Sequence, residues 1–338
     1  MLVLALVVGG VVWWRHRDHT EFAAAAARVP AGTQRISWTD WSAVRAHEHA
    51  ALSGGSSTGD LRRFLSRAYD DDLSSTSALV SSAPVLQQRF GFSPATIDWE
   101  LFSQSDQGAV VMMHLPSSDL GAVADHLTRL GYQQPATPGG VWSGGDDLVA
   151  RISGSLTPEL AYVAIDADDS LVLTSDSASY LALAVAAATG HGDRVSGLSG
   201  VVDASGEPLA AAVYSGDYAC NALAMAHADA GDQAAAARLL RAAGEVDPYS
   251  AFAMSEQPDG TVRVALQFTG SDEARANADS RARLASGPAP GQGGTFGDRF
   301  SVDDVSASGS VVTMRLTPRP DAALLSDLTS GPVLFASC

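Results

Sequence analysis

Apolar and polar residues alternate with a period of two in several short runs of this chain. Because side chains of a strand point alternately to its two faces, this period predicts strands with one buried face. The strand-like runs of the first half are residues 34–41 and 95–104, which alternate, and residues 108–116 and 161–175, which are more continuously apolar. Runs with helical spacing lie between or after them, in residues 42–90, 117–131 and 177–190.

The second half repeats this order of patterns. A strand-like run and a helical hairpin are followed by a β-hairpin that turns at Pro-Asp-Gly, a helix, another hairpin and a last helix. The runs are residues 209–218, 219–244, 250–268, 271–287, 300–318 and 321–331. Each half therefore reads β-α-β-β-α-β-β-α, which predicts an α+β fold of two tandem related units, with a mainly antiparallel sheet and helices packed on it.

A local match supports this duplication. The stretch RISWTDW, which begins at Arg35, and the stretch AVYSGDY, which begins at Ala212, each carry a branched apolar residue followed four positions later by an aspartate and an aromatic residue. The aspartates are Asp40 and Asp217. We interpret the two stretches as the same strand in each copy; the alternative is a coincidence of two common α+β patterns. The predicted units are residues 21–192 and 193–338.

The chain begins with an apolar segment, MLVLALVVGGVVWW, followed by RHRD. As a helix, these fourteen residues would cover about 21 Å of the roughly 30 Å hydrocarbon core of a bilayer. We predict an N-terminal transmembrane anchor and flank over residues 1–20; the alternatives are the apolar region of a signal peptide and a buried helix. This makes the membrane a predicted partner and gives a single-pass localisation, although Arg15 and Arg17 favour the cytoplasmic side for the rest of the chain.

The two cysteines favour the outer side. Cys220 comes after the AVYSGDY stretch, and Cys338 ends an apolar run with a strand-like pattern, GPVLFASC. We predict a Cys220–Cys338 disulfide, which would place the body in an oxidising, extracytoplasmic compartment. The alternative is two unrelated buried thiols.

Charge and composition exclude several classes of function. The chain has 38 acidic residues against 21 Lys+Arg, and because it contains no lysine every one of these cations is an arginine. The net charge of -17 repels the phosphates of nucleic acid, so we predict no nucleic-acid partner. Without lysine, a phosphate-binding P-loop and Schiff-base chemistry are excluded. No pattern indicates a cofactor.

Several motifs have a candidate chemistry and a structural alternative. Ser57, in GSSTG, fits a nucleophile pattern, but the surrounding polar residues favour a flexible loop. His47 and His49 flank Glu48 and could hold a metal, but on the predicted helix they would diverge, and the spacing shows no third ligand. The acidic runs at residues 70–72 and 166–169 could hold calcium, but no distant glutamate follows as in an EF-hand loop, and the second run lies where a hairpin must turn.

The tryptophans Trp38, Trp41 and Trp99 alternate with polar residues and are expected in the core. The segment from Cys220 to Pro248 has the spacing of one tetratricopeptide repeat. Because such repeats need neighbours, we interpret it as a helical hairpin packed on the sheet.

The stretches RARLASGPAPGQGG and LTSGPVLFASC lie in the region 195–338. This region resembles uncharacterised membrane-anchored proteins of actinobacterial type that have no assigned activity. The resemblance implies an envelope location and supplies no site residues.

The favoured function is a non-enzymatic, membrane-anchored envelope protein that binds a partner protein or an apolar ligand. The alternative is a hydrolase-like enzyme with an acidic cleft between the two halves, in which Asp40 and Asp217 act as acid and base. Their structural alternative is to cap the helices that come next in the chain. A cytoplasmic regulator is a third class, if the anchor is misread.

Overall fold

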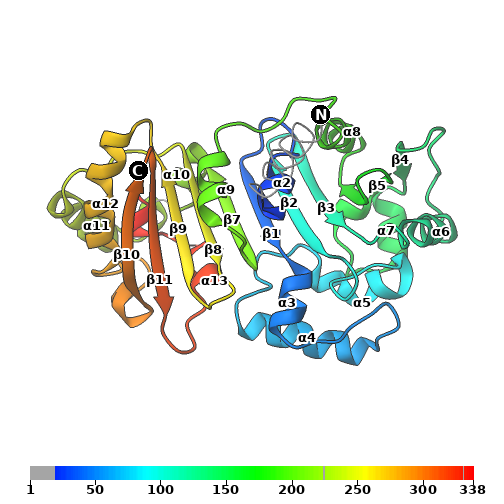
Figure 1. Ribbon diagram of the computed structural model, residues 1–338, viewed down its shortest axis with the longest axis horizontal. Helices are drawn as coiled ribbons and strands as arrows, with labels where there is room; N and C mark the ends of the chain where they lie inside the picture. The colour runs from blue at the N-terminus through cyan, green and yellow to red at the C-terminus, as the bar shows by residue number, and fades with distance from the viewer. Residues whose placement is uncertain (1–19, 224, 330) are drawn as a thin grey trace, which may run out of the picture.

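The computed structural model describes residues 20–223, 225–329 and 331–338. The strands of this part of the chain form one sheet of eleven in which every neighbouring pair is antiparallel (Figure 1). The sheet order is β10-β11-β9-β8-β7-β1-β2-β3-β6-β5-β4. The strands are β1 (Arg35–Thr39), β2 (Trp99–Ser105), β3 (Gly108–His114), β4 (Val141–Ser143), β5 (Tyr162–Asp166), β6 (Leu171–Ser175), β7 (Ala210–Ser215), β8 (Ala251–Glu256), β9 (Val262–Gln267), β10 (Phe300–Ser308) and β11 (Val311–Pro318).

Helices pack on both faces of this sheet, so the predicted α+β class with a mainly antiparallel sheet is confirmed. The helices are α2 (Glu21–Ala26), α3 (Trp41–His47), α4 (Thr58–Asp70), α5 (Ala83–Val85), α6 (Leu120–Leu130), α7 (Asp146–Ile152), α8 (Ala178–Ala188), α9 (Ser199–Ser205), α10 (Gly216–Ala222), α11 (Ala230–Ala243), α12 (Ser271–Ala285) and α13 (Leu324–Leu328). The sequence patterns predict neither the short β4 and α7 nor α9, which precedes β7.

The alternation along each strand divides its side chains between two cores. In β2, Trp99 and Leu101 face the core that α2, α8 and α9 cover, whereas Phe102 packs on the opposite face. The first of these cores runs across both halves of the sheet. On the opposite face each half has a core of its own, under α3, α4 and α6 in one half and under α11 and α12 in the other (Figure 1). Trp38 and Trp41 are buried, as predicted.

Strands β1 and β7 join the two halves. Ile36 pairs with Val213, and the pairing is symmetric about this position. Outward from it, the strands have the same order on both sides: β2, β3, β6 and β5 on one, and β8, β9, β11 and β10 on the other. One sheet therefore runs through both predicted units, and residues 192 and 193, where the sequence predicts the boundary between them, lie between α8 and α9.

A disulfide links Cys220, in α10, to Cys338, as predicted. The residues before Cys338 do not form the strand that their apolar pattern indicates, because Leu334–Ala336 is a 3-10 turn. Arg281 of α12 holds this turn from within the core. It is fully buried, and its guanidinium donates to the carbonyls of Phe335 (2.8 Å) and Ser337 (2.5 Å).

The prediction of a single-pass membrane anchor is corrected, and with it the membrane as a partner and the membrane localisation. In residues 20–223, 225–329 and 331–338 no helix combines the length and apolarity needed to cross a bilayer. The longest helix of this part, α12, has 15 residues, whereas a span takes about 20. Residues 1–19, where the sequence pattern was interpreted as the anchor, lie outside the described residues.

Candidate functional site

The structure places Asp40 and Asp217 at opposite ends of the β1–β7 pair. The amide of Asp40 donates to the carbonyl of Leu209 (2.8 Å), just before β7. At the other end, the amide of Ser215, two residues before Asp217, donates to the carbonyl of Gln34 (2.8 Å). Since the two strands are antiparallel, the residues that follow them in the chain lie at opposite ends of the strand pair. The two carboxylates therefore share no cleft and form no acid–base pair.

Asp40 caps helix α3, which is the structural alternative to catalysis. Its Oδ1 accepts from the amide of Ala43 (2.8 Å) and from the hydroxyl of Ser42 (2.9 Å). We expect Asp40→Ala to lower the free energy of unfolding by about 1 kcal/mol and Asp40→Asn to be nearly neutral, because asparagine caps equally well. Urea denaturation of the two variants measures this. Equal losses in both would contradict the capping role.

Two other motifs serve local structure. Ser57 is the N-cap of α4: its Oγ accepts from the amide of Asp60 (3.1 Å) and donates to the carboxylate of that residue (2.6 Å). In the second acidic run, Asp166 turns the chain between β5 and β6 by accepting from the amide of Asp168 (3.1 Å). These contacts give Ser57 no catalytic partner and give Asp166 no further calcium ligand.

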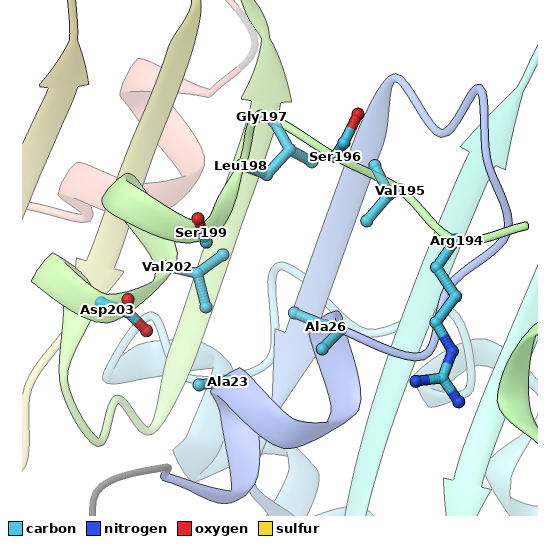
Figure 2. A pocket seen from close by; sticks show the side chains of 11 residues that line it. Ala23, Ala26, Arg194, Val195, Ser196, Gly197, Leu198, Ser199, Val202 and Asp203 are labelled. Atoms are coloured by element: carbon cyan, nitrogen blue, oxygen red, sulfur yellow. The ribbon is translucent and has the colours of Figure 1, made fainter. Parts of the chain in front are cut away.

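An apolar pocket of about 400 Å³ lies between α2, α9 and the segment that leads from α8 into α9 (Figure 2). Its apolar walls come from Ala23 and Ala26 on one side and from Leu198 and Val202 on the other. Arg194, Ser196, Ser199 and Asp203 supply polar groups at its edge. This volume lies within the roughly 300–1,000 Å³ of small-molecule sites, and apolar walls with a few polar groups are typical of them.

The alanines of α2 create this space. Phe22 packs into the core beneath the helix, whereas the small side chains of Ala23 and Ala26 face α9 and leave the gap between them unfilled. Arg194 lines one side of the pocket, opposite Asp203 (Figure 2). The Nε and Nη2 of Arg194 donate to the carbonyls of Ala187 (2.8 Å) and Ala188 (3.4 Å) at the end of α8, whereas Nη1 makes no hydrogen bond to the described residues.

An acidic cleft of about 340 Å³ lies between the two halves of the chain. The first half contributes His47 and the run Asp70, Asp71 and Asp72; the second contributes Glu256, Gln257 and Asp321. Asp72 ties the two sides together, because its carboxylate accepts from the amides of Leu325 (2.6 Å) and Ser326 (3.1 Å) at the start of α13. The start of a helix carries a partial positive charge, which stabilises a carboxylate placed there.

Two carboxyl groups of the cleft have raised pKa values. Burial raises the pKa of Glu256 to about 8, and the neighbouring charges of Asp72, Asp259 and Asp71 act in the same direction. Burial also raises the pKa of Asp72, although the hydrogen bonds from Ser326, Ser75 and Leu325 oppose it. Glu256 is thus largely protonated at pH 7.

Beside the cleft, His47 and Glu48 meet Asp71, whose carboxylate supplies the third ligand that the spacing in the sequence does not show. Their candidate ligand atoms lie within 4.8 Å of one another. His49 is not part of this group; it lies beyond the end of α3, in a turn with left-handed backbone (φ 49°), and not on the helix that the sequence predicts for it. Burial, and after it the carboxylate of Asp71, raises the pKa of Glu48, while Arg67 lowers it.

No family model and no curated protein matches this chain. Crystal form III of TP0453 is similar to it at 8% identity, over 90% of this chain and 97% of the other, with a TM-score of 0.42. Crystal form I of TP0453 gives 8% identity, 90% and 96% coverage, and a TM-score of 0.40. At these scores the likeness supports no conclusion about function, and the resemblance to actinobacterial proteins stays a prediction.

Proposed function

We propose that this protein is a non-enzymatic binding protein whose pocket between α2 and α9 takes an amphipathic molecule with one apolar chain and one anionic group. The observation that carries the proposal is the pocket of about 400 Å³ with walls of Ala23, Ala26, Leu198 and Val202. Removing the apolar chain of a ligand from water contributes about 0.8 kcal/mol per buried methylene group.

Arg194 supplies the reason for an anionic group. Arg194 lines the pocket, and its Nη1 makes no hydrogen bond to the described residues, so it can donate to a carboxylate of the ligand. Asp203 lies on the opposite side (Figure 2). A carboxylate near Arg194 therefore fixes the direction in which the chain enters.

The Ala23→Leu variant tests the pocket. The added atoms should fill part of the space and lower the affinity for decanoic acid about tenfold, since every 1.4 kcal/mol is tenfold. Ala24→Leu is the matched control, because Ala24 lies next in the same helix but is exposed and outside the pocket. Calorimetry on the full chain measures both. Equal affinities of wild type and Ala23→Leu would place the ligand elsewhere.

A second comparison tests the anionic group. Arg194→Gln should weaken decanoic acid about tenfold and leave decanol unchanged, because only the acid uses the guanidinium. If the acid and the alcohol weaken together, the substitution has damaged the pocket; if neither changes, Arg194 plays no part. Capture of a protein instead of a small molecule by the full chain, lost in Ala23→Leu, would make the occupant a partner protein.

We further propose that the two halves derive from one duplicated β-α-β-β-α-β-β-α plan, divided near residues 192 and 193. The supporting observations are the symmetric pairing at Ile36 and Val213 and the equal strand order on both sides of it. A superposition of the two halves should place β1, β2, β3, β6 and β5 on β7, β8, β9, β11 and β10. A superposition that fails in this order would contradict duplication.

A hydrolase is the second candidate, favoured by the acidic cleft between the halves. There Glu256 can donate a proton near neutral pH while a carboxylate of the run at residues 70–72 accepts one. Turnover of nitrophenyl esters, glycosides or phosphates that disappears in Glu256→Gln would favour it. No turnover on this panel, or turnover that the substitution leaves unchanged, would count against it.

A further inference from the structure

The C-terminal ends of α3 and α4 bring an imidazole and two carboxylates together. His47 is the last residue of α3, Glu48 is its C-cap, and Asp71 is the C-cap of α4. Their ligand atoms lie within 4.8 Å of one another. Helix C-termini carry a partial negative charge of their own, which adds to the two carboxylates. This place in the fold therefore favours a bound cation.

Glu48 is the part of this group that solvent does not stabilise. Its side chain is only 5% exposed, and Oε2 accepts from Nε of Arg67 (3.0 Å). Its Oε1 is buried, and no hydrogen-bond donor of the described residues reaches it. A buried oxygen without a partner is costly. Arg67 thus fixes one oxygen of the carboxylate and leaves the other, Oε1, without a donor and open to an ion.

We propose that His47, Glu48 and Asp71 bind one divalent transition-metal ion, for which zinc is the fitting probe. Imidazole nitrogen selects such metals over magnesium and calcium, and carboxylate oxygens complete the set. Bonds from zinc to such donors are about 2.0–2.2 Å long, and the side chains would adjust to these lengths around the ion. His47 and Asp71 are both exposed and can make this adjustment.

The ion would be accessible from the acidic cleft, because His47 and Asp71 also line that cleft. Three protein ligands leave at least one coordination position open, as in sites that exchange a water or a ligand. This inference is independent of the apolar pocket, which lies between α2 and α9 and shares no residue with it.

Zinc titration of the full chain, first freed of metal by chelation, tests the proposal. We expect one zinc ion per chain, and an affinity that falls at least about 10–100-fold in Glu48→Gln and in Asp71→Asn, because removal even of groups that only orient the ligands costs this much. X-ray absorption of the zinc complex should show imidazole scattering that disappears in His47→Gln.

Two control variants separate the site from general negative charge. His49→Asn keeps a residue that accepts the left-handed backbone at this position (φ 49°), and Asp70→Asn removes the neighbouring carboxylate; both should bind zinc as the wild type does. Circular dichroism without metal checks that all variants fold. The proposal is overturned if the wild type binds no zinc. The cation between the carboxylates of Glu48 and Asp71 would then be a proton. Equal weakening in the controls would overturn it too.

Discussion

Replacing both Cys220 and Cys338 with serine should lower the free energy of unfolding by about 4–5 kcal/mol. The disulfide closes a loop with a sequence separation of 118 residues, and in the chain-entropy model the stabilisation grows with the logarithm of this length. It also holds the C-terminal turn against the core, where Phe335 packs on Phe296 and Phe300 and Tyr249 donates its hydroxyl to the carbonyl of Ala336 (2.8 Å). Loss of the bond releases this turn to fray.

Guanidinium denaturation with and without reductant measures this effect. Reductant should destabilise the wild type by the same amount as the double substitution and should leave the double variant unchanged. Cys220→Ser alone is the matched control, and it should be as stable as the double variant because the one remaining thiol forms no bridge within the chain. A reductant effect on the double variant would show that another process is being measured.

The strands were predictable because one physical rule governs them. The side chains of a strand alternate between its two faces, and the run around Trp99 shows this as alternating apolar and polar residues. The run around Val213 is apolar throughout, because both of its faces are buried. The proline-flanked hairpin at Pro258-Asp259-Gly260 was predictable for the same local reason, since Gly260 has a positive φ of 76°. Short elements such as β4, with three residues, give too little pattern to detect.

The candidate sites were less predictable because their residues meet through topology. Asp40 and Asp217 match in sequence, yet they lie at opposite ends of the β1–β7 pair because these two strands are antiparallel. Asp71 reaches His47 and Glu48 only because the ends of α3 and α4 converge. The acidic run at residues 70–72 was a signal for this site, but nothing in the spacing indicates its partners at the end of α3.

The apolar pocket left an even weaker signal in the sequence. Its walls combine the alanines of α2 with residues 194–203, a segment of mixed glycine, serine and valine that has no strong period. A pocket is a place where side chains fail to fill space, and small residues such as Ala23 mark it only when their neighbours across the gap are known.

Glu256→Gln should make the protein more stable than the wild type at pH 8, with the difference vanishing near pH 4. The pKa of Glu256 rises from an ordinary 4.5 to about 8 on folding, chiefly because of burial. Between these values the folded chain holds a proton that the unfolded chain has released, so the wild type loses stability as the pH rises from about 4.5 to about 8. The loss is at most about 5 kcal/mol, and solvent in the cleft reduces it to about 2–4 kcal/mol.

Urea denaturation of both proteins between pH 4 and pH 9, in a chelating buffer that keeps the neighbouring carboxylates free of metal, measures this difference. Glutamine keeps the shape of the side chain and carries no charge, so the variant lacks this part of the pH dependence. Glu245→Gln, at an exposed position, should follow the wild-type curve. A Glu256→Gln curve that stays parallel to the wild type from pH 4 to pH 9 would show that the cleft hydrates the Glu256 carboxylate fully, and Glu256 would then have no proton to donate near neutral pH.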